Sequence, residues 1–339
     1  MPSLGADMVE GKLVEWRIKP GDTVKRGDIV AVVETPKAAV DVESWQDGMV
    51  QELLTKPGET VPVGAVMAVL LAPGEAPREV VRKKISPAAR KRAAELGVDA
   101  ERIAGTGPDG AVTVEDIEKV GKAAPAPAVD RAAEMRKAIA AAMSRSKREI
   151  PHYYLSHSVS LARAAAWLEA ENARRALPER LLMAALFIKA TALAGKEFPE
   201  MNGHYREGAF QPSAAVHVGV AISLRQGGLI APAIHDAEKL ALTDLMKALT
   251  DLVKRARAGS LRSSEMSDPT ITVTNLGEGG VDAVFGVIYP PQVALVGFGA
   301  PREGRVVASV SGDHRVSDGY RGALFLAAIE RLLQAPEKL

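Results

Sequence analysis

An internal repeat in the first 71 residues limits what the chain can fold into more than any other feature. The segment Lys19–Val24 (KPGDTV) recurs 37 positions later as Lys56–Val61 (KPGETV), and Gly27 recurs as Gly64. Two copies of short, valine-rich segments, each punctuated by Pro-Gly and a further glycine, are too few for a solenoid. The repeat therefore predicts two interlocked β-sheets.

A hairpin with a lysine at its tip is expected where the two halves of the repeat meet. Ile29–Glu34 and Ala39–Glu43 have the composition of strands, and Lys37 lies between them. A lysine on an exposed turn is usually only a solvated charge. Here, however, the symmetric frame presents one lysine at the apex of a rigid scaffold.

The composition excludes several classes of protein. The 339 residues are enough for two or three domains, and the net charge of +1 gives no electrostatic case for nucleic acid or an anionic membrane. No apolar run approaches the ~20 residues of a membrane span, and no signal-peptide pattern is present. The chain has no cysteine, which excludes disulfides, cysteine nucleophiles and thiolate metal sites and fits a reducing cytoplasm. Any thiol chemistry must therefore come from a cofactor.

Two Pro-containing linkers, 72–84 and 121–130, are expected to flank a small helical piece at 85–120. Ser86-Pro87 is typical of a helix start, with helix continuing over Ala88–Leu96, and Thr113–Asp116 has the pattern of a capping box. Two short helices make a marginal core, so this piece is expected to bind a partner.

Residues 131–339 are expected to form one large mixed α/β unit. The predicted helices are Arg131–Arg148, stretches within Leu161–Lys196, Thr243–Ala258, and Tyr320–Leu333 with an apolar side of Ala323, Leu324, Ala327, Ala328 and Leu332. The predicted strands are His152–Val159, Ala215–Ser223, Ile271–Thr274, Val293–Gly297 and Val306–Val310. Gly-rich phosphate-binding patterns are missing, so an antiparallel or mixed sheet is favoured over regular βαβ winding.

His314 is the histidine whose position suggests catalysis. It lies between a predicted strand and the last helix, a corner that can aim an imidazole into a cleft, and Asp318 four residues later is either its support or a helix N-cap. The other histidines are expected to be structural and have no metal-ligand spacing, so no metal site is expected: His152, His157, His204, His217 and His235.

Residues 1–71 resemble a lipoyl domain, the swinging-arm carrier of the 2-oxo acid dehydrogenase complexes. The resemblance implies an all-β domain, a flattened barrel of two sheets, with lipoate attached to Lys37 by an amide bond. The flanks Pro36 and Ala38 differ from the methionines beside the lysine of biotin carriers, so lipoate is expected.

Residues 85–120 resemble the peripheral subunit-binding domain of the same complexes, a small α-helical domain. The charges expected to meet its partner are Lys83, Lys84, Arg90, Lys91 and Arg92.

Residues 131–339 resemble the acyltransferase domain of the dihydrolipoyl acyltransferases, an α/β fold of the chloramphenicol acetyltransferase-like type. The family signature Asp-His-Arg-x-x-Asp-Gly is matched by Asp313–Gly319. Further similar segments are Pro151–Tyr154, Gly228–Pro232, Thr274–Gly277 and Pro290–Ala294. The connection Ala300–Arg305 is shorter than relatives commonly have.

The resemblance implies that His314 is the general base that takes the proton from the thiol of coenzyme A. An imidazole pKa near ~6.5 suits this task at neutral pH. Thr274 stands where the family usually has the serine whose hydroxyl stabilises the oxyanion, and Asp318 would support the corner.

The implied protein is the E2 core subunit of a 2-oxo acid dehydrogenase complex, working with an E1 2-oxo acid decarboxylase and an E3 dihydrolipoyl dehydrogenase. It would form homotrimers in which His314 of one chain faces Thr274 of another. Acetyl is the favoured acyl group, while pyruvate, acetoin and branched 2-oxo acids stay open as its source. Also open are assembly into a cube or larger shell, and whether E1 or E3 docks on the helical piece.

A non-catalytic, lipoyl-bearing docking scaffold is the alternative. The presence of both His314 and the Thr274 hydroxyl argues against it, because a scaffold needs neither.

Overall fold

The computed structural model describes residues 1–2, 8, 10–35, 39–71, 85–96, 105–108, 111–121, 131–224 and 228–339. Lys37, the predicted linker residues 72–84 with Lys83 and Lys84, and residues 122–130 of the second linker lie outside this set. Among the helices of the described ranges, none is both long enough and apolar enough to span a membrane.

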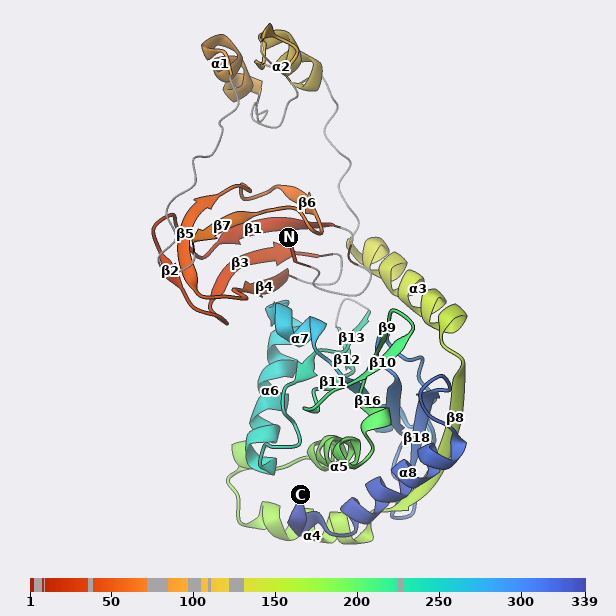
Figure 1. The fold of residues 1–339 in the computed structure, drawn as a ribbon. Coiled ribbons are helices and arrows are strands. Elements are labelled where there is room, and N and C mark those ends of the chain that lie inside the picture. Colours follow the sequence, from red (N-terminus) through yellow and green to blue (C-terminus); the bar gives the residue numbers. More distant parts are fainter. Residues whose placement is uncertain are drawn as a thin grey trace. The chain divides into compact units, whose positions relative to one another are not determined.

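The N-terminal part consists of two groups of paired strands (Figure 1). In one group, β1 pairs with β3 and β6, and β3 pairs with β4; in the other, β5 pairs with β2 and β7. The strands are β1 (Glu10–Trp16), β2 (Thr23–Val24), β3 (Ile29–Glu34), β4 (Ala39–Glu43), β5 (Gly48–Leu53), β6 (Thr60–Pro62) and β7 (Ala68–Leu71). Leu13, Val33 and Val40 are fully buried between them. The predicted pair of sheets is confirmed.

The two copies of the repeat form the same turn. The Asp22 carboxylate accepts a hydrogen bond from the backbone N–H of Lys19 at 2.8 Å. At the equivalent place, Glu59 accepts one from the N–H of Lys56 at 2.8 Å. The glycine inside each turn has φ of 96° or 89°, which side-chain-bearing residues rarely adopt. The repeated Pro-Gly is therefore a repeated backbone conformation.

The predicted hairpin at the repeat junction is also confirmed. β3 and β4 are antiparallel, and Glu34 lies opposite Ala39. The chain therefore reverses between these two residues, and Lys37 belongs to the connection.

The described residues between 85 and 121 form a compact unit of their own. It contains α1 (Pro87–Leu96) and α2 (Val114–Gly121). Ser86 caps α1, because its Oγ accepts a hydrogen bond from the N–H of Ala89 at 3.1 Å. The buried Asp116 carboxylate accepts four hydrogen bonds, from the N–H and hydroxyl groups of Thr106 and Thr113. This carboxylate therefore ties the loop before α2 to the helix.

The C-terminal part is built on a mixed sheet with strand order β14-β11-β16-β17-β18-β8. β11, β16 and β17 are parallel, whereas β18 runs antiparallel to both β17 and β8, and β14 is antiparallel to β11. The bounds are β8 (His152–Ser160), β11 (Val218–Val220), β14 (Ala233–Ile234), β16 (Ile271–Asn275), β17 (Ala294–Phe298) and β18 (Arg305–Asp313). This confirms the predicted mixed α/β architecture.

Short pairs of strands lie outside this sheet. They include β9 (Gly203–Arg206) with β10 (Ala209–Pro212), and β12 (Ile222–Ser223) with β13 (Leu229–Ile230). A further two-residue strand is β15 (Leu261–Arg262). The strand character predicted over Ala215–Ser223 is found in two pieces, β11 and β12, because the chain leaves β16 after Val220 and pairs with β13 instead.

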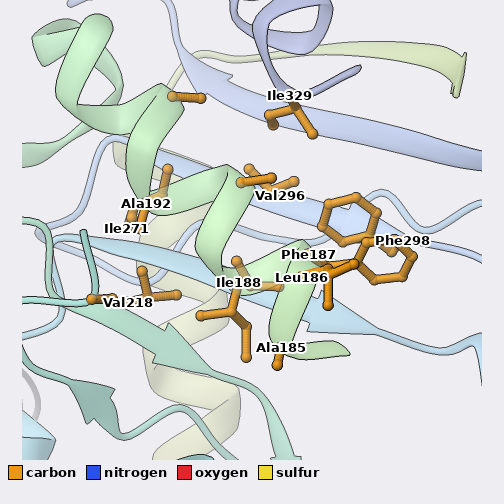
Figure 2. Packing of buried hydrophobic residues seen from close by; sticks show 14 of the residues in the cluster. Ala185, Leu186, Phe187, Ile188, Ala192, Val218, Ile271, Val296, Phe298 and Ile329 are labelled. Atoms are coloured by element: carbon orange, nitrogen blue, oxygen red, sulfur yellow. The ribbon is translucent and has the colours of Figure 1, made fainter. Parts of the chain in front are cut away.

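Helices supply the remaining layers of this part. They are α3 (Arg131–Glu149), α4 (Ala162–Ala173), α5 (Met183–Glu197), α6 (Leu242–Ala258), α7 (Ser263–Ser267) and α8 (Gly319–Leu333). Figure 2 shows the core between α5 and the sheet, where Phe187 stacks on Phe298 with ring centroids 4.2 Å apart. Ile188 and Val296 are buried beside them.

The apolar side predicted for the last helix was wrong. Of the predicted residues, Ala323, Leu324 and Ala327 are exposed. The buried residues of α8 are Gly322, Phe325, Leu326, Ala328, Ile329 and Leu333. Leucine and alanine occur on every side of this helix, so their spacing does not predict which side is buried. The buried side is the one that packs against β8 and α5.

The short connection Ala300–Arg305 is a tight turn. Arg302 and Arg305 exchange backbone hydrogen bonds of 2.8 Å. Glu303 and Gly304, between them, both have positive φ, of 50° and 74°. This is the conformation of the turns that close two-residue β-hairpins.

Candidate active site

His314 lies at a sharp corner between β18 and α8. Its backbone N–H donates to the Pro151 carbonyl at 3.0 Å, and the N–H of Ser317 donates to the Asp313 carbonyl at 3.0 Å. The His314 side chain is exposed, and neither ring nitrogen makes a hydrogen bond to another described residue. The corner therefore presents a free imidazole on a backbone that is fixed on both sides.

The residues on either side of His314 form an ion pair in which the carboxylate is buried and the guanidinium is partly exposed. Asp313 is fully buried, and its carboxylate accepts hydrogen bonds from the Arg315 guanidinium at 2.6 to 3.1 Å and from the Arg315 N–H at 2.9 Å. This pairing raises the pKa of Arg315. The guanidinium carbon lies 3.9 Å from the ring centroid of Tyr205 in β9. Because each side chain flanking His314 holds the other, the ion pair restrains the corner.

Asp318 is the N-cap of α8. Its carboxylate accepts a hydrogen bond from the N–H of Arg321 at 2.9 Å. This was one of the two roles expected for it. The carboxylate therefore fixes where the helix begins, four residues after His314.

Thr274 lies far from His314 in the same chain. It is near the end of β16 and 9% exposed, and the strand register places it level with Gly297 of β17 and, through it, Ser309 of β18. His314 is five residues beyond Ser309. At ~3.3 Å per residue and ~4.8 Å per strand, the two lie roughly 19 Å apart. Within one chain, the His314 imidazole and the Thr274 hydroxyl are therefore not brought together.

The remaining histidines make structural hydrogen bonds. His152 accepts from the Ile288 N–H at 3.1 Å, and its Nδ1 lies 2.8 Å from the Ile150 carbonyl oxygen. The other four have these partners within 2.6 to 3.0 Å: Glu330 for His157, the Pro269 carbonyl for His204, the Asp236 N–H for His217 and Asp268 for His235.

Burial and hydrogen bonding shift the pKa of four of these rings. Burial lowers the pKa of His152, His204 and His217, whereas hydrogen bonding to Asp268 raises the pKa of His235. The described residues contain no cluster of three or more His, Asp or Glu side chains suited to a metal ion.

Three residues of the corner were not among those assigned from the sequence. They are Asp313 and Arg315, which flank His314, and Tyr153 in β8, whose ring contacts its imidazole. Asp313 and Arg315 stand in the motif around His314, so the sequence could indicate that they matter. The sequence has no signal that the two side chains pair with each other.

The C-terminal part thus combines a mixed sheet with an exposed imidazole at a strand-to-helix corner, and comparison with known families defines the class of protein to which it belongs. Residues 126–339 match the family described as 2-oxoacid dehydrogenases acyltransferase (catalytic domain). The chain belongs to this family. Residues 1–70 match the family described as Biotin-requiring enzyme, which covers biotin and lipoyl carriers, and residues 83–118 match the e3 binding domain.

The similarity to some relatives extends over the whole chain. The chain is 31% identical to the dihydrolipoyllysine-residue acetyltransferase component of the pyruvate dehydrogenase complex of Rhizobium meliloti, covering 99% of this chain and 98% of the relative. It is 28% identical to the corresponding component of the acetoin cleaving system of Bacillus subtilis, covering 100% and 98%.

Solved structures of acyltransferase cores match the C-terminal part. The dihydrolipoamide acetyltransferase of Azotobacter vinelandii is 26% identical with a TM-score of 0.57, covering 64% of this chain and 99% of that one. The cubic core of a pyruvate dehydrogenase complex is 25% identical with a TM-score of 0.57, at the same coverage. The chain is therefore an acyltransferase of the E2 class.

Proposed function

We propose that this chain transfers an acyl group from lipoyl-Lys37 to coenzyme A, with His314 as general base and Thr274 of a neighbouring chain as oxyanion donor. The observation that carries the proposal is the corner itself, where the residue that bears the exposed His314 imidazole lies between the Asp313–Arg315 ion pair and a capped helix. The roughly 19 Å between His314 and Thr274 within one chain supports a site shared between chains. The Azotobacter relative was studied for the catalytic roles of a serine, a histidine and an asparagine.

The proton and electron balance of the transfer is simple. A ring nitrogen of His314 accepts the proton of the coenzyme A thiol, and the sulfur attacks the carbonyl carbon of the acyl thioester. The Thr274 hydroxyl donates a hydrogen bond to the carbonyl oxygen as negative charge develops there. When the carbon–sulfur bond to the carrier breaks, His314 returns the proton to the departing thiolate. One thioester is exchanged for another, with no net redox change.

The hairpin fits a covalent carrier group on Lys37. The pairing of Glu34 with Ala39 leaves four residues to connect β3 and β4, and Lys37 is the lysine among them. Lipoate, when attached there, supplies the thiol that carries the acyl group. The domain boundaries proposed around it are 1–71, 85–120 and 131–339, joined by linkers 72–84 and 121–130.

Partners and substrate follow from the relatives. The match to an e3 binding domain supports docking of E3 on the helical unit, with E1 as the enzyme that loads the lipoyl group. Acetyl is the proposed acyl group, because the pyruvate and acetoin relatives are both named acetyltransferases. The proposed assembly is a homotrimer that builds a cubic core, as in the similar core structure. The proposed compartment is the cytoplasm, because a chain without cysteine fits a reducing environment.

The test is acetyl transfer from acetyl-dihydrolipoamide to coenzyme A by the purified chain. Transfer that saturates with both substrates and is lost in His314→Ala is expected. A protein that carries lipoate and binds E3 but transfers no acyl group, from acetyl or branched donors, would instead be a docking scaffold.

A further inference from the structure

The ring of Tyr153 is confined between two glycines. A Cβ atom built on Gly312 in β18 would lie 2.3 Å from the ring Cζ, and one built on Gly322 in α8 would lie 2.9 Å from Cε2. Both distances are shorter than carbon atoms tolerate. Gly322 lies inside a helix, where glycine is disfavoured, and neither glycine has positive φ. Both positions therefore provide space for the ring.

The hydroxyl of Tyr153 reaches the backbone corner that carries His314. It lies 2.8 Å from Oγ of Ser317, which is 8% exposed. The Ser317 N–H in turn donates to the Asp313 carbonyl. Burial raises the pKa of Tyr153, so its hydroxyl stays protonated at neutral pH. One side chain thus links β8 to the corner.

The ring of Tyr153 also contacts the imidazole. The two ring centroids are 5.5 Å apart and the planes meet at 74°, an edge-to-face arrangement. The ring nitrogens of His314 have no hydrogen-bond partner among the described residues, so the edge of the Tyr153 ring is a contact that can restrain the imidazole without occupying a ring nitrogen.

We propose that Tyr153 is a positioning residue for His314: its clamped ring orients the imidazole, and its hydroxyl secures the corner through Ser317. This inference rests on the proposed role of His314 as base. Proton transfer depends on the direction of a ring nitrogen, and a displacement of ~1 Å can lower a rate about 10²-fold. Loss of the ring should therefore lower kcat and leave the KM for coenzyme A unchanged.

Tyr153→Leu and Tyr153→Phe separate the ring from the hydroxyl. In the full-length lipoylated protein, Tyr153→Leu should lower kcat about 10- to 100-fold at temperatures well below unfolding. Tyr153→Phe keeps the ring and should restore kcat to within about 5-fold of wild type. Wild-type kcat in Tyr153→Leu would overturn the inference, and so would a Tyr153→Phe variant as slow as Tyr153→Leu.

Gly322→Ala provides a test that does not remove the tyrosine. The new methyl group would lie 2.9 Å from Tyr153 Cε2 and equally close to Leu155 Cδ1, so it crowds the ring from the α8 side. Alanine favours the helix, so a lower kcat cannot be ascribed to a weaker helix. Gly195→Ala in α5 is the matched control, because its Cβ would meet its nearest neighbour at an ordinary 3.5 Å. We expect kcat to fall about 10-fold in Gly322→Ala only. Equal activity of the two variants would contradict the proposal, even if Tyr153→Leu fails to fold.

His314→Ala separates a failure of His314 as the base from a failure of Tyr153 as its positioning residue. If it keeps full activity, the proposed function of this site fails, and the role of Tyr153 falls with it. If His314→Ala is inactive while Tyr153→Leu and Gly322→Ala are both fully active, only the role of Tyr153 is wrong.

Discussion

Thr274 and His314 of one chain lie at opposite ends of the central sheet. Thr274 is level with Ser309 through the register of three strands, and His314 is five residues farther along β18. An oxyanion donor and a general base must both reach the reacting thioester, each within about 3 Å of its target. If His314 and Thr274 are the base and the oxyanion donor, as proposed, a working site requires the two residues to come from different chains.

Replacement of His314 should remove the chemistry and leave the fold intact. The imidazole is exposed and packs into no core, so His314→Ala is expected to lower kcat about 10²–10⁴-fold with little change in unfolding temperature. His157→Gln is the control, since His157 of β8 pairs with Glu330 of α8 and not with the corner. Steady-state kinetics and calorimetry measure both effects; near-native turnover of His314→Ala would refute its role as base.

Lys37 should be the residue that becomes lipoylated. When the chain is produced with a lipoylating enzyme and lipoate, the intact mass should rise by one lipoyl group. Lys37→Ala should abolish the increase, and Lys25→Ala, an exposed lysine of the same domain, should not. A lipoylated Lys37→Ala protein would move the attachment site elsewhere.

Asp318 should act through the start of α8. Asp318→Ala removes the N-cap and should lower the free energy of unfolding by about 1 kcal/mol, whereas Asp318→Ser keeps a cap and should lose only a few tenths. Chemical denaturation measures the loss of stability in each variant. The loss of kcat should likewise be larger in Asp318→Ala than in Asp318→Ser. If Asp318→Ser is stable and yet as inactive as Asp318→Ala, the carboxylate takes part in the reaction directly.

Asp116 should make the helical unit sensitive to acid. Hydrogen bonds from Thr106 and Thr113 hold the pKa of this carboxyl well below its usual range. Because the folded pKa lies below the unfolded value, the stabilisation is complete above about pH 4 and is lost as pH falls further. In the full-length protein, NMR signals of residues 85–121 should collapse toward unfolded positions on acidification.

The substitution Asp116→Asn should weaken the unit already at pH 7 and flatten this pH dependence. Glu115→Gln is the matched control, because Glu115 is the exposed neighbour on the same turn. A unit that stays folded at pH 2 in the wild type would show that another interaction dominates its stability.

The turns and caps could be predicted because they depend on neighbouring residues. The repeated Pro-Gly turns, the hairpin around Lys37 and the cap at Ser86 are each set within a few positions of the chain. The buried side of α8 could not be predicted, because leucine and alanine occur on every side of the helix and packing with distant elements decides which of them are buried.

The site was predictable in part for the same reason. His314 and Asp318 stand in one short motif at a strand-to-helix corner. The contact of Tyr153 with that corner joins residues 161 positions apart, and the separation of Thr274 from His314 requires the register of three strands. Neither relationship has a local signal in the sequence.

The most direct test of the shared site is to mix two inactive variants. His314→Ala and Thr274→Ala chains, unfolded, combined in equal amounts and refolded together, should form trimers in which about a quarter of the interfaces pair an intact histidine with an intact threonine. Activity should therefore rise from near zero in each parent to about a quarter of the wild-type value. As a control, wild type mixed equally with the double variant should also give about a quarter, whereas a site within one chain would give about half. Native mass measurement verifies that mixed trimers have formed. If these mixed trimers are as inactive as their parents, the site is not shared between chains.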